Sequence, residues 1–73
     1  MASKGSSNLR EDARATRENI LAVATSEFAD KGLAGARIDE IAELTASSKR
    51  MIYYYFGSKD ELYRAVLERA YQA

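Results

Sequence analysis

The residues with the clearest chemical potential lie in one stretch, residues 45–59. This stretch contains Lys49, Arg50 and Lys59 and three consecutive tyrosines at 53–55, and it contains no acidic residue. Arginine offers two parallel donors and tyrosine a flat ring with one hydroxyl, so both residue types suit phosphates and base edges. The same tyrosines could instead be amphipathic surface residues, with packed rings and hydrated hydroxyls.

Other kinds of chemistry have little support in the sequence. The chain has no cysteine and no histidine, so it lacks thiolates and the commonest general base and metal ligand. Tyr55 and Lys59 have the Tyr-x-x-x-Lys spacing of some dehydrogenases, but that chemistry needs a dinucleotide fold with a glycine-rich turn. The 73 residues show no strand pattern, and Gly57 interrupts the pair. We therefore expect no enzyme, no metal and no cofactor.

Charge is unevenly distributed along the chain. The formal net charge is zero, yet residues 20–47 carry a net −3 and residues 48–59 a net +3. Such a positive patch on an acidic body would orient the molecule towards a polyanion. The chain has no hydrophobic leader and no apolar run of membrane-spanning length, so we expect a soluble, cytoplasmic protein with no membrane partner. Absent cysteines fit a reducing compartment.

The elements that position these residues are predicted to be helices in one small all-α domain. Residues 1–14 are Ser-, Gly- and charge-rich and read as a flexible basic arm, either solvated or reaching into a minor groove. A first helix is expected from about Thr16, its N-cap, to Lys31, before Gly32. Its buried stripe is Ile20, Leu21, Val23, Ala24 and Phe28.

A second, short helix is expected over about Arg37 to Leu44 and a third over about 48–55. The inward residues of the second helix are predicted to be Ile38, Ile41, Ala42 and Leu44. On the third helix Ile52 and Phe56 share the buried face, while Arg50 and Tyr54 each lie about 160° from Ile52 and Met51 and Tyr53 about 100°. Two short helices joined by a tight turn are typical of a helix-turn-helix, whose second helix enters the major groove.

A fourth helix is predicted from Ser58, which forms a capping box with Glu61. It carries two apolar stripes, one of Leu62, Val66 and Ala70 and one of Tyr63, Leu67 and Tyr71, which is more than a three-helix core requires. Lys59 and Arg37 both place a cation at a positive helix start, a conflict that a bound phosphate would resolve. Arg37 could equally pair with Glu40 or Glu43.

The run from Arg37 to Leu62, and above all Ile52-Tyr-Tyr-Tyr-Phe-Gly-Ser-Lys-Asp-Glu-Leu62, resembles the N-terminal DNA-binding domain of TetR-family regulators. Residues 20–28 with Gly32 are similar to that family's first helix. The resemblance implies a homeodomain-like three-helix domain over 15–57, with the start of a fourth helix over 58–73 leading to a domain outside this sequence. It also implies a bacterial transcriptional regulator, usually a repressor, that binds a palindromic operator in double-stranded DNA as a homodimer. A small-molecule inducer would act only through that further domain.

Carried over by motif, the resemblance assigns roles to individual residues. Ser48 and Lys59 would bind phosphates, Lys49 and Arg50 would approach base edges, and Met51 could contact a thymine methyl. Tyr53 and Tyr54 would contact phosphate, sugar or base. The helical geometry places Lys49 only about 60° from Ile52, so its side chain must extend around the helix end.

The sequence departs from the family pattern in the turn and at the second helix. Ala46 stands where glycine is frequent, Ser47 where an apolar residue is frequent, and Arg37 where a hydroxyl residue is usual. If the turn requires a left-handed residue at position 46, alanine costs about 1 kcal/mol there. The alternative function is a helical protein-interaction module that uses the apolar faces of residues 58–73.

Overall fold

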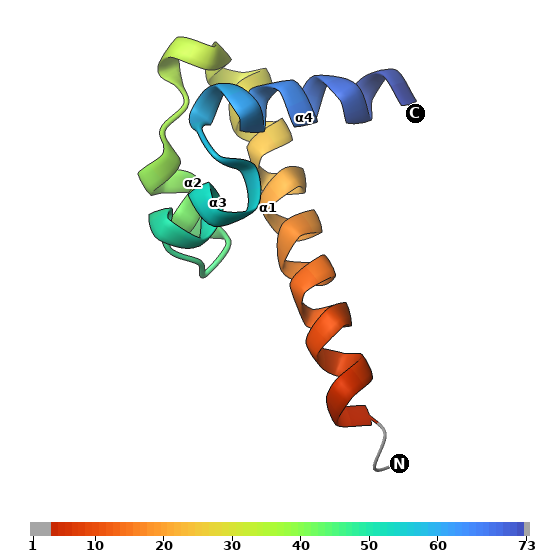
Figure 1. Ribbon diagram of the computed structural model, residues 1–73. Coiled ribbons are helices and arrows are strands. Elements are labelled where there is room, and N and C mark those ends of the chain that lie inside the picture. The colour runs from red at the N-terminus through yellow and green to blue at the C-terminus, as the bar shows by residue number, and fades with distance from the viewer. Residues whose placement is uncertain (1–3, 73) are drawn as a thin grey trace.

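The computed structural model describes residues 4–72, with side chains from residue 12 onward. Over this range the chain forms four helices and no strand: α1 (Lys4–Gly35), α2 (Ile38–Leu44), α3 (Lys49–Phe56) and α4 (Lys59–Gln72). The first half of α1 projects away from the other helices, and α4 crosses its second half (Figure 1). The all-α prediction, with a helix-turn-helix and a fourth helix, is confirmed. No helix within residues 4–72 is long and apolar enough to cross a membrane.

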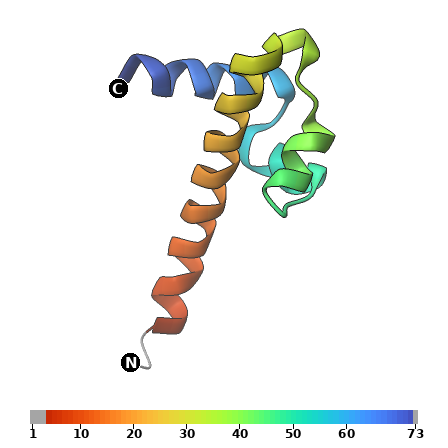
Figure 2. The same cartoon turned by 180° about the vertical axis from the view of Figure 1, so that it is seen from behind.

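The helix α1 begins earlier than the sequence pattern predicts. It starts at Lys4, so Thr16 lies inside the helix and the predicted N-cap there is wrong. The segment before Thr16 has no proline and contains several good helix formers, which extend the helix without needing a core. Residues 4–14 of the expected arm are therefore helical, and residues 1–3 lie outside the described residues. Seen from behind, this part of α1 again stands clear of the bundle (Figure 2).

The predicted stop at Gly32 is confirmed. Gly32 has φ 72° and ψ 173°, which interrupts the helical backbone of α1. Glycine accepts this conformation without the Cβ clash that other residues meet. The Ala36 amide then donates to the Gly32 carbonyl at 3.0 Å, and the chain turns towards α2.

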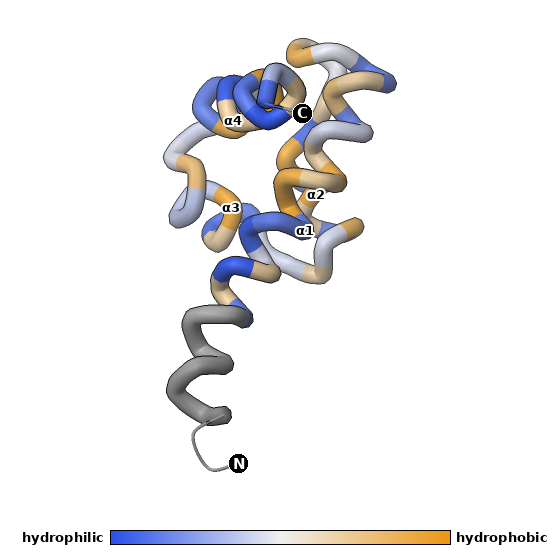
Figure 3. Tube along the Cα trace, turned by 90° about the vertical axis from the view of Figure 1, so that its right-hand side faces the viewer, coloured by the Kyte–Doolittle hydropathy of each residue, from blue (hydrophilic) through white to orange (hydrophobic). Residues whose placement is uncertain are grey.

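One hydrophobic core joins all four helices, and Figure 3 shows where hydrophobic residues lie along their Cα traces. Leu44 was expected in this core but is 62% exposed. It is the last residue of α2, and the helical turn that would continue its buried face is missing. Leu67 and Tyr71 are exposed on α4, so the predicted surplus apolar surface of that helix is present. The buried core consists of Ile20, Leu21, Ala24, Phe28, Ala36, Ile38, Ile41, Ala42, Ile52, Leu62 and Val66.

The turn between α2 and α3 has a left-handed residue at position 46. Ala46 has φ 54°, its amide donates to the Glu43 carbonyl at 3.2 Å, and the Ser47 amide donates to the Ala42 carbonyl at 2.9 Å. These two bonds are those of a Schellman motif, which normally has glycine at the left-handed position. The strain anticipated at Ala46 is therefore real, and it lies immediately before the third helix.

Replacing Ala46 by glycine is expected to stabilise the protein. Removing Cβ relieves about 1–2 kcal/mol of strain in the left-handed conformation of the folded state. Glycine also makes the unfolded chain more flexible, which offsets part of this, so the free energy of unfolding should rise by about 0.5–1 kcal/mol. Urea unfolding followed by circular dichroism would measure the change. Ala22→Gly, at an exposed position within α1, is the matched control and should destabilise by about 1 kcal/mol. A loss of stability in both variants would contradict a strained turn.

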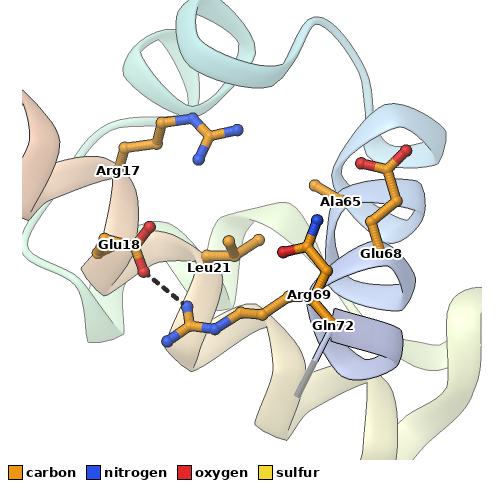
Figure 4. A pocket seen from close by; sticks show the side chains of 7 residues that line it. All are labelled: Arg17, Glu18, Leu21, Ala65, Glu68, Arg69 and Gln72. Carbon is orange, nitrogen blue, oxygen red and sulfur yellow. Dashed lines mark ion pairs between the residues drawn. The ribbon is translucent and has the colours of Figure 1, made fainter.

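Side chains at one part of α1 fix the positions of both α3 and α4. The Arg17 guanidinium lies 4.8 Å from the centre of the Phe56 ring, at the end of α3. Glu18 Oε1 lies 2.9 Å from Arg69 Nη1 of α4, and both residues line a hollow between the two helices (Figure 4). Further along, the Phe28 and Tyr63 rings meet edge to face at 5.0 Å.

The serine half of the predicted capping box forms at the start of α4. The Ser58 hydroxyl accepts a hydrogen bond from the Glu61 amide at 3.1 Å. Gly57, with φ 96°, ends α3, and its amide donates to the Tyr53 carbonyl at 2.7 Å. One glycine and one serine thus separate α3 from α4, so Lys59 begins α4 close to the end of α3.

Candidate nucleic-acid interface

The helix α3 is attached to the core by one fully buried side chain. Ile52 is 0% exposed, and on the same side Tyr55 and Phe56 are half-buried against the core. The opposite side is open to solvent: Arg50 is exposed, and Tyr54 is 79% exposed. The division between buried and exposed faces expected from helical spacing is therefore correct.

The two other outward residues predicted for α3, Met51 and Tyr53, are also exposed. The Tyr54 ring meets the Tyr55 ring edge to face, with centroids 5.4 Å apart. Tyr55 is half-buried, so it gives the exposed Tyr54 ring a fixed neighbour. Of the three tyrosines, Tyr53 and Tyr54 face solvent and Tyr55 packs against Tyr54.

Ser48 begins α3 as its N-cap. Its hydroxyl oxygen accepts a hydrogen bond from the Met51 amide at 3.1 Å, which satisfies one of the free donors of the helix start. The hydroxyl hydrogen is not used in that bond and can still be donated to an outside acceptor. The same side chain can therefore cap the helix and bind a phosphate.

Three predicted cations from three different helix starts line one hollow. Arg37 is the residue before α2, Lys49 is the first residue of α3, and Lys59 is the first residue of α4. Together with Tyr53 they line a hollow of about 260 Å³. Sequence analysis predicts a separate contact for each of these side chains, and the fold places them around the same hollow. Three ammonium or guanidinium groups around one small hollow suit an anion such as a phosphate.

An acidic residue, Asp39 of α2, also lines this hollow. Its Oδ1 lies 3.0 Å from Lys49 Nζ, and its Oδ2 lies 4.0 Å from Arg37 Nη2. The hydrogen bond from Lys49 lowers the pKa of Asp39 below its usual value. The same hydrogen bond raises the pKa of Lys49. Both side chains are more than half exposed, so the pair is a surface ion pair of small energy.

The ion-pair partners expected for Arg37 are wrong. Glu40 instead binds Lys31, whose Nζ lies 2.7 Å from Glu40 Oε1 and 3.1 Å from Glu27 Oε1. The hydrogen bond from Lys31 lowers the pKa of Glu40. This three-residue cluster joins the end of α1 to α2 and leaves Asp39 as the carboxylate nearest to Arg37 among the described residues.

The Lys49 side chain takes part in a contact between two helices. It reaches across to α2, where Asp39 holds it. No pattern in the sequence predicts this contact, because the two residues lie on different helices and Asp39 simply fits the polar side of α2. Tertiary packing alone places them side by side.

A second hollow, of about 470 Å³, lies beside Met51. Its lining includes the polar side chains of Thr16, Asn19 and Ser47, none of which sequence reasoning assigned to the interface. Thr16 was predicted as a helix cap and Ser47 as a turn residue. The packing of α1 against the turn between α2 and α3, a contact between segments far apart in the sequence, brings these residues together.

Comparison with known proteins gives a consistent relationship. Residues 20–66 match the family model described as bacterial regulatory proteins of the tetR family. The transcriptional repressor NicS of Pseudomonas putida is 52% identical over 56 residues, which cover 77% of this chain and 26% of that protein. The repressor SCO4008 of Streptomyces coelicolor is 48% identical over 58 residues, covering 80% of this chain and 30% of that protein.

A solved structure shows the same fold. The hemolysin II transcriptional regulator HlyIIR superposes with a TM-score of 0.73 at 38% identity, over 77% of this chain and 31% of that one. The chain therefore spans only about a quarter to a third of the length of these relatives. The matched part contains the helix-turn-helix described above. With its family model covering residues 20–66, the chain belongs to the TetR family of bacterial regulatory proteins.

Proposed function

We propose that this chain binds double-stranded DNA in a sequence-specific manner, as the DNA-binding part of a transcriptional regulator, most simply a repressor. One observation carries the proposal: α3 buries Ile52 and turns Arg50, Met51, Tyr53 and Tyr54 outward. An exposed helix of this size fits a major groove. The named relatives are repressors, which supports the direction of regulation.

The proposed roles follow from the position of each side chain. Arg50, exposed on the outer face of α3, reads a base edge, for which its two-pronged donor is suited. Met51 contacts a thymine methyl, and Tyr53 and Tyr54 contact sugar, phosphate or base. Phosphates bind at the Ser48 hydroxyl and at Arg37 and Lys59, which line one hollow, while Lys49 approaches a base edge.

The partners of the whole protein are also part of the proposal. In a protein as long as its relatives, the chain acts as one half of a homodimer on a palindromic operator, since dimers of helix-turn-helix units bind paired half-sites. A small-molecule inducer acts through a domain outside these residues. A regulator of this class works in the cytoplasm, where bacterial DNA lies.

Selection of bound duplexes from a random pool tests the central proposal. The selected duplexes should share a motif, and the logarithm of the binding constant should fall linearly with the logarithm of salt, by about 0.9 for each phosphate neutralised. A helical protein-interaction module would instead select no duplex and would respond to changes at Leu67 or Tyr71, which are exposed on α4. Failure to enrich any motif would overturn sequence-specific DNA binding.

Replacing Lys59 by alanine is expected to weaken binding to all duplexes alike. Removing one phosphate contact lowers the steepness of the salt dependence by about 0.9, without changing which duplex is preferred. Fluorescence anisotropy with the selected and a scrambled duplex measures both effects. Arg64→Ala is the matched control, since Arg64 lies on the same helix and is exposed but does not line the hollow. Equal losses of slope in the two variants would contradict a local phosphate site.

A further inference from the structure

The hollow lined by Arg37, Lys49 and Lys59 contains an acidic residue in its lining, Asp39. A carboxylate disfavours the approach of a phosphate, so its place beside three cations calls for an explanation. Its contact with Lys49, at 3.0 Å, is much closer than its contact with Arg37, at 4.0 Å. Asp39 therefore acts mainly on Lys49.

The position of Lys49 explains what this contact changes. Lys49 is the first residue of α3, and its ammonium has three donors, of which Asp39 engages one. A phosphate that approaches the remaining donors also approaches the Asp39 oxygen 3.0 Å from the same nitrogen, and the two negative charges repel each other. A neutral acceptor, such as O6 or N7 of guanine, meets no such repulsion between full charges.

We propose that Asp39 is a specificity-determining positioning residue: it holds the Lys49 ammonium away from phosphates and leaves it available to neutral base edges. Asp39 thereby weakens binding to DNA of arbitrary sequence more than binding to the preferred site. The inference rests on the proposed DNA-binding function and adds a residue that acts through Lys49 rather than through contact of its own. The negative charge of Asp39 thus favours discrimination between DNA sequences over the highest affinity for DNA of any sequence.

Asp39→Asn is the variant that isolates this role. Asparagine keeps the shape of the side chain and removes its charge. The Asp39–Lys49 ion pair is exposed on both sides, and surface pairs of this kind contribute little to stability, so the melting temperature should stay nearly unchanged. A purely structural role for Asp39 would instead appear as a lower melting temperature with an unchanged salt dependence.

The experiment measures binding constants of four variants across 50–200 mM salt on a random-sequence duplex and on the selected duplex. In Asp39→Asn the released Lys49 should neutralise one further phosphate on the random duplex. The slope of the logarithm of the binding constant against the logarithm of salt should then steepen by about 0.9, so that the affinity falls about threefold more across this range than in the unaltered protein. The preference for the selected duplex over the random duplex, at the low end of the range, should decrease by about threefold or more.

Three further proteins test whether the effect acts through Lys49: the Lys49→Gln variant, the double variant with Asp39→Asn, and a control at another residue of α2. In a Lys49→Gln background, Asp39→Asn should change the slope little, because its target is gone. Glu43→Gln makes the same change of net charge on an exposed residue of the same helix that does not line the hollow, and its slope should match that of the unaltered protein.

The proposal is overturned if Asp39→Asn leaves the slope unchanged, if its effect persists in full without Lys49, or if affinity rises equally on both duplexes. An effect of equal size in Glu43→Gln would also overturn it. The unaltered protein is the reference for the underlying function: if it binds no duplex, DNA binding itself fails, whereas binding without a response to Asp39 removes only this inference.

Discussion

Replacing Ile52 by alanine is expected to destabilise the protein by about 2–5 kcal/mol, the largest effect of any change considered. Ile52 is 0% exposed and is the buried residue of α3, an eight-residue helix that is too short to be stable without packing. A hydrophobic core in a chain of this size rarely supplies more than about 3–5 kcal/mol of net stability, so the variant should be largely unfolded or close to it. Urea unfolding followed by circular dichroism measures the loss.

Two controls separate the buried side chain from the helix that carries it. Ile52→Val removes one methyl group and should cost about 0.5–1.5 kcal/mol, which leaves the fold and DNA binding measurable. Met51→Ala, at the neighbouring exposed position, should change stability by about 0.5 kcal/mol or less. If Ile52→Ala proved as mild as Met51→Ala, α3 would not depend on this side chain for its position.

Replacing Arg50 by alanine is expected to relax sequence preference by about 1–3 kcal/mol, or roughly five- to 150-fold, at the base pair it reads. Arg50 is exposed on the face of α3 opposite Ile52, and an arginine there can donate two parallel bonds to one base. The measurement compares binding to the selected duplex with binding to duplexes substituted at each position of the motif. Discrimination should collapse at one position and persist at the others.

Arg50→Lys is the matched control, because it keeps the charge and loses the two-pronged geometry. Its affinity for a scrambled duplex should remain near that of the unaltered protein, while discrimination at the same base pair should still fall. If the lysine variant kept full discrimination, Arg50 would act as a point charge on a phosphate rather than as a reader of a base.

Local patterns predicted most of the fold. The spacing of Ile20, Ala24 and Phe28 marks the buried side of α1. Gly32 and Gly57 mark helix ends, and Ser58 marks a helix start. These signals depend on residues close together in the chain, so periodicity and capping rules reach them directly.

The remaining features depend on contacts between helices. Leu44 has the pattern of a core residue, yet α2 ends there and the side chain is left exposed. The pairing of Asp39 with Lys49 needs the crossing of α2 and α3 to be known first. The early start of α1 has another explanation: the residues before Thr16 show no apolar periodicity in the sequence, so helical spacing gives no indication of a helix there.

The contacts of Arg17 and Glu18 have a mechanical consequence. Consecutive residues leave a helix about 100° apart, so one peptide unit of α1 serves two neighbours: Arg17 stacks on Phe56 of α3, and Glu18 pairs with Arg69 of α4. A rotation of this part of α1 about its own axis would therefore disturb its contacts with α3 and with α4 together.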